Sequence, residues 1–175
     1  QTCALPIFKA NLRYIKAKAG VPVLAVVKAD AYGHGLVRCA QTAIEAGADY
    51  LGTATLTEAI ALREAGIKAP LLAWLLPPGE DFKRAVQLDI ELGLSSLAAF
   101  DEVNKIPGGK IHLEVESGMG RGGFSNEWPE LLNRDLSKVV GVFTHLARAD
   151  EPNEAQNKIQ IENFEKFIED LKARG

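Results

Sequence analysis

Short apolar segments alternate with amphipathic segments along the chain. Six of them are rich in Val, Ile and Leu and too short for a typical helix, which predicts strands. The predicted strands comprise residues 23–29, 50–56, 70–76, 90–94, 110–117 and 139–147. The segments between them carry apolar residues at helical spacing, and several end in glycine, which predicts helices. The sequence therefore predicts six strand–helix units.

Two of the predicted helices have a particularly clear signal. Thr55 and Glu58 have the spacing of a capping box, so a helix should begin there after the second strand. The other is the last helix, which is indicated by apolar residues at helical spacing, namely Ile161, Phe164, Ile168 and Leu171.

Near-continuous apolar strands that alternate with helices are typical of a parallel α/β sheet covered by helices. Two closures are possible. One is an open, doubly wound sheet, and the other is a (β/α)8 barrel, which needs eight strands and about 250 residues. Six strands alone favour the open sheet, because a barrel would be cut off before its last two units.

Composition and net charge indicate which class of partner this chain can bind. The 175 residues are 47% hydrophobic and 25% charged, as in a soluble globular domain. The net charge of −3 provides no basic field for nucleic acid or an anionic membrane, so a small molecule is the expected partner. Cys3 and Cys39 are too few for a disulfide scaffold or a metal site, and no apolar run has membrane-spanning length. We expect a cytoplasmic protein without a bound metal.

The chemistry begins at the end of the first strand, in the string VVKADAYGHG (26–35). A lysine at the rim of a buried strand can lose its proton more readily than one in water, as a Schiff-base nucleophile must. Lys28 occupies that place, and Tyr32 offers a hydroxyl close by in sequence. For an isolated lysine, a stem packed on apolar surface with its ammonium in solvent would be the more common arrangement.

This string resembles the pyridoxal-phosphate attachment motif of alanine racemases without a gap. The resemblance implies a (β/α)8 barrel followed by a β-rich domain, a homodimer, and interconversion of L- and D-alanine for peptidoglycan. It implies that Lys28 binds pyridoxal 5'-phosphate as a Schiff base and is one of two acid/base groups. Tyr32 would bond the cofactor phosphate. His34 would be structural, and Asp30 would cap the following turn.

Two further segments resemble the same family in order and spacing. HLEVESGMGRGGF (112–124) contains Arg121, which would bond the cofactor's phenolic oxygen and help hold the substrate carboxylate. GVFTHLARAD (141–150) contains His145, which would lie beside the pyridine ring. These matches outweigh the strand count and favour the barrel.

One position departs from the family pattern. Family members often carry a lysine at the position of Glu114, where carbon dioxide converts it to a carbamate that pairs with the arginine. We interpret Glu114 as a direct source of that negative charge, paired with Arg121. Strand alternation places Glu114 on the same face as His112 and Glu116, and His112 is taken as structural.

The resemblance covers about the first half of an alanine racemase. We therefore expect a barrel truncated to about six strand–helix units, without the C-terminal β domain. The family's second base, a tyrosine of that domain, has no counterpart among Tyr14, Tyr32 and Tyr50, so the chain alone should be catalytically incomplete. Residues 1–7 resemble a translated adapter and are taken as non-native, which leaves 8–175 as the partial barrel.

Three other interpretations stay open. A broad-specificity amino-acid racemase would differ mainly in pocket residues beyond Gly175. A non-catalytic pyridoxal-phosphate-binding protein of the single-barrel kind would be expected to have a different lysine motif, so AYGHG argues against it. An α/β domain without a cofactor would form no adduct at Lys28.

Overall fold

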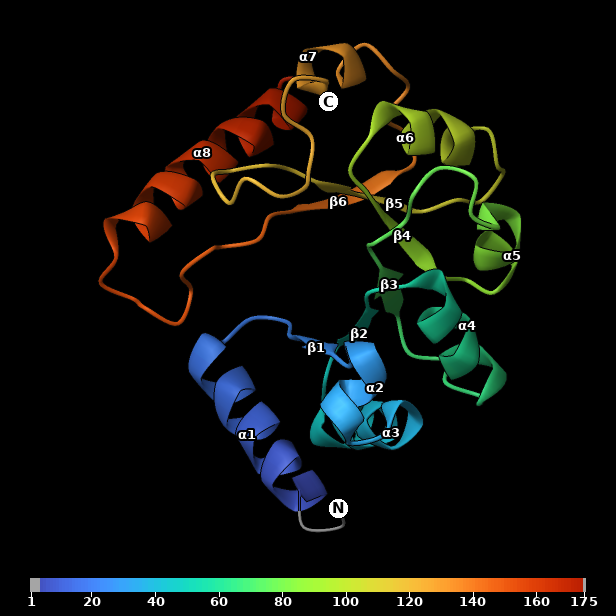
Figure 1. The fold of residues 1–175 in the computed structure, drawn as a ribbon, viewed down its shortest axis with the longest axis vertical. Helices are drawn as coiled ribbons and strands as arrows, with labels where there is room; N and C mark the ends of the chain where they lie inside the picture. Colours follow the sequence, from blue (N-terminus) through green and yellow to red (C-terminus); the bar gives the residue numbers. More distant parts are fainter. Residues whose placement is uncertain (1–3, 175) are drawn as a thin grey trace. The chain divides into compact units, whose positions relative to one another are not determined.

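The computed structural model describes residues 4–174, in which six strands alternate with eight helices (Figure 1). The strands are β1 (Leu24–Val26), β2 (Tyr50–Thr53), β3 (Leu71–Ala73), β4 (Glu91–Leu94), β5 (Ile111–Glu114) and β6 (Val139–Phe143). The helices are α1 (Ala4–Ala19), α2 (Lys28–Gly33), α3 (Leu36–Ala46), α4 (Leu56–Glu64), α5 (Phe82–Gln87), α6 (Leu97–Asn104), α7 (Trp128–Leu131) and α8 (Ala155–Lys172). In the sheet, the strands follow chain order.

The chain divides into two compact units. The first comprises residues 1–76 and 80–92, and the second comprises 77–79 and 93–175. All six predicted strands are present, each shorter than its apolar segment. The predicted non-native segment 1–7 lies partly outside the described residues, and its residues 4–7 belong to the first turns of α1. Its origin stays a prediction.

The first unit is built on the parallel pairs β1–β2, β2–β3 and β3–β4. Each strand buries apolar side chains, with Leu51 and Leu71 fully buried in register across β2 and β3. Helix α1 packs beside α3 (Figure 1) and is tied to the start of β2 by the Lys16–Asp49 pair at 2.8 Å. The capping box predicted at Thr55 and Glu58 is confirmed at the start of α4.

The second unit contains the parallel pair β5–β6. Its core includes Phe100 of α6, Leu113 of β5 and Phe124 of the following loop. Trp128 of α7 packs edge-on against Phe167 of α8, with ring centroids 4.8 Å apart, and donates a hydrogen bond to Asp170 at 2.9 Å. These contacts hold α7 and α8 together (Figure 1).

The predicted last helix is confirmed as α8, but its apolar residues at helical spacing are not its buried ones. Ile161 is 46% exposed, and the other three of these apolar residues are only partly buried. The buried residues of the helix are instead polar, Asn157 and Gln160. The reason is that α8 is attached to neighbouring loops through side-chain amides, which hydrogen-bond backbone and hydroxyl groups. Helical periodicity of apolar residues does not detect such an interface.

Candidate active site

Lys28 lies immediately beyond the carboxyl end of β1. The backbone N–H of Val27 still donates to the carbonyl of Gly52 at 2.8 Å, so the ladder with β2 extends one residue past the strand. Val27 is fully buried, whereas Lys28 is half-buried. The apolar strand therefore places Lys28 at the edge of the sheet where helix N-termini and loop N–H groups also lie.

The chain after Lys28 forms a left-handed turn. Ala29, Asp30, Ala31 and Tyr32 all have φ between 50° and 54°, although none is glycine. Each such residue is destabilised by about 1–2 kcal/mol relative to the right-handed conformation. The predicted strand was too long at this end, because β1 stops at Val26 and residues 27–29 lead into the turn. It leaves Tyr32 75% exposed, with its hydroxyl available to a ligand.

Side-chain carboxylates stabilise this strained turn at both ends. Glu58 Oε1 accepts a hydrogen bond from the N–H of Ala29 at 2.6 Å. Asp30 Oδ1 accepts one from the N–H of Leu36 at 2.7 Å, which confirms the predicted cap of the following turn. His34 lies exposed between α2 and α3.

The carboxylate of Glu58 accepts hydrogen bonds both from the turn after Lys28 and from the start of α4. Besides Ala29, it accepts hydrogen bonds from the N–H groups of Ala54 and Thr55, each at 3.0 Å, at the start of α4. Burial raises the pKa of Glu58, but these backbone hydrogen bonds outweigh burial and lower the pKa below its ordinary value. The sequence indicated only the capping box; the bond to the lysine turn was not predictable from local spacing.

In the second unit, Arg121 and His145 are brought together. Arg121 lies in the glycine-rich loop after β5, and His145 follows the carboxyl end of β6. The Nη2 atom of Arg121 is 3.3 Å from Nδ1 of His145. The structure thus holds Lys28 and Tyr32 on one turn of the first unit, and Arg121 in contact with His145 in the second.

The loop that carries Arg121 is folded around the carboxylate of Glu116. Four consecutive backbone N–H groups, those of residues 118–121, donate to this carboxylate at 2.5, 2.6, 2.8 and 3.1 Å. Burial raises the pKa of Glu116, but the four hydrogen bonds outweigh it, so the pKa lies below its ordinary value. The carboxylate of Glu116 therefore fixes the backbone path of the loop up to Arg121.

Replacing Glu116 with glutamine is expected to lower the free energy of unfolding by about 2 kcal/mol at neutral pH, since bonds to a charged acceptor are lost. Because the folded-state pKa is lowered, this stabilisation is present above the unfolded pKa of about 4.3 and disappears as pH falls through the folded value. Urea unfolding followed by tryptophan fluorescence across pH checks this. The exposed Glu165→Gln is the control, and a pH-independent difference would contradict the prediction.

Glu114, at the end of β5, is 7% exposed. Burial raises the pKa of its carboxyl; the nearby charge of Arg121 lowers it, and that of Glu116 raises it. The charge of Arg121 therefore acts on this carboxyl, and the pairing of Glu114 with Arg121 stays a prediction. Among the described residues, no group of three or more His, Cys, Asp or Glu side chains could hold a metal ion.

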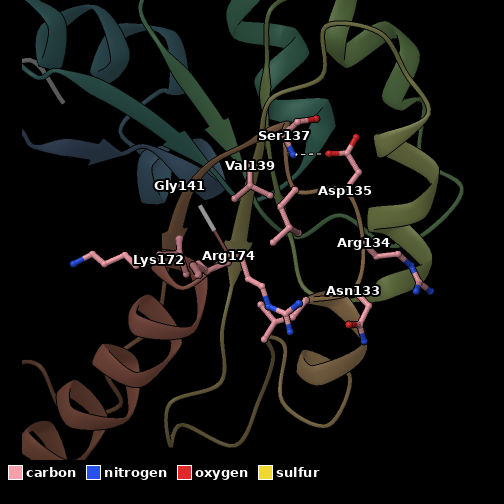
Figure 2. Close-up of a pocket in the computed structure, with 12 residues that line it drawn as sticks. Asn133, Arg134, Asp135, Ser137, Val139, Gly141, Lys172 and Arg174 are labelled. Atoms are coloured by element: carbon pink, nitrogen blue, oxygen red, sulfur yellow. Dashed lines mark hydrogen bonds between the residues drawn. The ribbon is translucent and has the colours of Figure 1, made fainter.

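A cavity of about 800 Å³ lies elsewhere in the second unit (Figure 2). Its lining includes Asp135, Val139, Gly141, Leu171 and Arg174, and the N–H of Ser137 donates to Asp135 at 2.9 Å beside it. The cavity adjoins the amino-terminal part of β6, whereas Arg121 and His145 lie beyond the carboxyl ends of their strands. It is therefore separate from the predicted site residues.

Several residues of this region were missed by sequence reasoning. Glu58 and Glu116 were interpreted only as a helix cap and a strand residue, although both organise loops through backbone N–H groups. A signal did exist in α8, where amide side chains recur at helical spacing. They are Gln156, Asn157, Gln160 and Asn163.

A lysine after the first strand, and an arginine and a histidine after the fifth and sixth, place the functional groups at the carboxyl ends of parallel strands. That arrangement, with helices between the strands, defines part of a (β/α) barrel. The profile of the family described as "Alanine racemase, N-terminal domain" matches residues 4–175. The chain belongs to this family.

Individual relatives agree with this assignment. The chain is 44% identical over 163 residues to the alanine racemase of Thermobifida fusca, covering 86% of this chain and 44% of that protein. It is 38% identical over 173 residues to that of Salinispora tropica, covering 91% and 46%. The crystal structure of the Streptomyces lavendulae alanine racemase superposes with a TM-score of 0.92 at 37% identity, covering 98% of this chain and 48% of that one.

The chain thus spans about half the length of the relatives it matches. This explains why strand number alone favoured an open sheet. The count of six strands is correct, but it describes part of a barrel. In the described part of the chain, no helix is both long and apolar enough to cross a membrane.

Proposed function

We propose that the protein carrying this chain catalyses pyridoxal-phosphate-dependent interconversion of L- and D-alanine, in the cytoplasm, and supplies D-alanine for peptidoglycan. The observation that carries the proposal is Lys28 at the carboxyl end of β1, in a chain of the alanine racemase family. Since the chain covers about half of its relatives, the activity is proposed for a protein that also contains the second half. That half would supply a tyrosine across a homodimer.

The residues of this chain fit pyridoxal phosphate. Lys28 provides an amine at the sheet edge, and the exposed Tyr32 can donate its hydroxyl to a phosphate. The guanidinium of Arg121 has five N–H donors. Its contact with His145 is made by the Nη2 group. A planar guanidinium beside an imidazole ring suits a phenolic oxygen and a carboxylate.

Each residue then has a distinct role. Bound pyridoxal phosphate delocalises the electron pair left when the substrate loses its Cα proton. Lys28 would hold the cofactor and would move that proton on one face of the substrate. Tyr32 would hold the cofactor phosphate. Arg121 would hold the phenolic oxygen and orient the substrate carboxylate, and His145 would help to hold the pyridine ring.

The test uses the intact protein incubated with pyridoxal phosphate. Interconversion of L- and D-alanine, followed by chiral chromatography, should occur together with a borohydride-reducible adduct that peptide mass mapping locates at Lys28. An adduct without racemisation would replace the proposal with a non-catalytic binding protein. Equal rates on several amino acids would favour a broad-specificity racemase, and no adduct at Lys28 would overturn the cofactor assignment.

Glu114→Gln tests whether the buried carboxylate orients Arg121. We expect turnover to fall about tenfold, corresponding to about 1.4 kcal/mol of lost charge pairing in the transition state. Stability at neutral pH should not fall, because the raised pKa means that ionised Glu114 opposes folding above the unfolded pKa of about 4.3. Steady-state kinetics and urea unfolding check both parts, and unchanged turnover and cofactor affinity would refute the pairing.

A further inference from the structure

One buried side chain of α8 lies between the two segments that carry Arg121 and His145. Gln160 is 0% exposed. Its Nε2 donates hydrogen bonds to Ser117 Oγ at 3.1 Å and to the carbonyl of His145 at 3.0 Å. Its Oε1 accepts one from the N–H of Ala147 at 2.8 Å. Both ends of the amide are therefore used to join the loop after β5 to the segment after β6.

The network continues from Ser117 into the ends of the strands. Ser117 Oγ lies 2.7 Å from Thr144 Oγ1, and Thr144 Oγ1 is 2.8 Å from the carbonyl of Val115. Since a carbonyl can only accept, the Thr144 hydroxyl donates to Val115 and the Ser117 hydroxyl donates to Thr144. Ser117 is then free to accept from Gln160. Every donor in this chain of bonds has one acceptor, which makes the network rigid.

Packing adds a steric constraint to the hydrogen bonds. A methyl group placed on Gly118 would lie 3.1 Å from Cγ of Gln160, so the loop backbone rests directly on this side chain. Gly118 lies three residues before Arg121, in the same loop. Movement of Gln160 would therefore displace the Arg121 loop.

We infer that Gln160 is a positioning residue that fixes the Arg121 guanidinium against the His145 imidazole. The inference rests on the proposed function for its catalytic consequence. Gln160 binds the backbone of His145 itself and the second residue after it, and it contacts the loop of Arg121 through Ser117. The 3.3 Å contact between Arg121 and His145 depends on the spacing of these two segments.

Two other amides of α8 provide a comparison. Gln156 Nε2 donates to the carbonyl of Gly118 at 3.1 Å, and Asn163 Nδ2 donates to that of Ser117 at 3.0 Å. Both bonds reach the Arg121 loop alone. Gln156→Met is therefore a matched control, because it removes an amide bond to the same loop without affecting the His145 segment.

The experiment compares Gln160→Met and Gln156→Met in the intact protein. Methionine keeps the length of the side chain and removes its hydrogen bonds. We expect Gln160→Met to lose the nuclear Overhauser contacts between the Arg121 side chain and the His145 ring, and to lower kcat by about 10- to 100-fold, as for misplaced catalytic groups. Gln156→Met should retain the contacts and change kcat less than about twofold.

Retained Arg121–His145 contacts and unchanged kcat in a folded Gln160→Met protein would overturn the inference. If that variant does not fold, Gln160→Glu replaces it. This variant keeps an acceptor for Ala147 and loses both donors when ionised, so the same losses are expected at neutral pH, with partial recovery when low pH restores a donor. Absence of racemisation by the wild-type protein would contradict the proposed function, while the nuclear Overhauser comparison would still test the positioning role.

Discussion

Replacing Lys28 with alanine is expected to abolish the borohydride-reducible cofactor adduct and to lower racemase activity by at least about a thousandfold. General acid–base catalysis alone contributes about 10²–10⁴-fold, and the variant also loses covalent attachment. No loss of folding is expected, since the side chain is half-buried at the sheet edge and the strained turn is held by Glu58 and Asp30. Racemase assays and peptide mass mapping measure the two effects.

Lys68→Ala is the matched control, because Lys68 is an exposed lysine of the same unit. It should keep both the adduct and the activity. A Lys28→Ala protein that still racemises alanine at a tenth of the wild-type rate would assign the chemistry to another group. An adduct that moves to a different lysine would have the same meaning.

Gly123→Ala should be the most destabilising substitution in the Arg121 loop. Gly123 has a φ of +113°, and an added Cβ would lie 2.6 Å from backbone atoms of Val115 and Glu116. Those atoms belong to the bridge between Val115 and Phe124, which has little freedom to move. Backbone strain and overpacking each contribute about 1–3 kcal/mol, so we expect a loss of about 3–5 kcal/mol in the free energy of unfolding.

Gly120→Ala separates conformational strain from steric overlap. Gly120 has a φ of +73°, but nothing lies within 4 Å of an added Cβ. We expect a loss of only about 1–2 kcal/mol, which is the strain of the left-handed conformation. Urea unfolding of the two variants in the same protein measures the difference. Equal losses would show that the close approach at Gly123 is relieved by local movement.

The periodicity of the chain predicted the strands and most helices, because it reports burial of apolar side chains directly. It predicted the helix α8 but not the buried residues of that helix, which are amides. It also placed the end of the first strand at residue 29, three residues beyond β1. The left-handed turn that ends β1 is stabilised by Glu58, which is 29 residues from its partner Ala29, and local pattern contains no signal for such a bond.

The candidate site was predictable where it depended on long, specific strings. Lys28 and Tyr32 came from one string, and Arg121 and His145 came from two others whose proximity the structure then showed. The residues that hold these groups in place were not predictable in the same way. Glu116 and Gln160 act through backbone and side-chain hydrogen bonds that exist only once the loops have folded.

The left-handed turn after Lys28 links the final placement of this lysine to the order in which the chain folds. Four consecutive residues in this conformation are disfavoured by roughly 4–8 kcal/mol in an isolated segment. The bond from Ala29 to Glu58 becomes available only after β2 and the first turn of α4 have formed. During synthesis, the lysine segment is therefore expected to remain in ordinary conformations until Glu58, 29 residues after Ala29, has also emerged. Lys28 therefore reaches its final geometry only after the first unit has assembled, and not in the nascent chain.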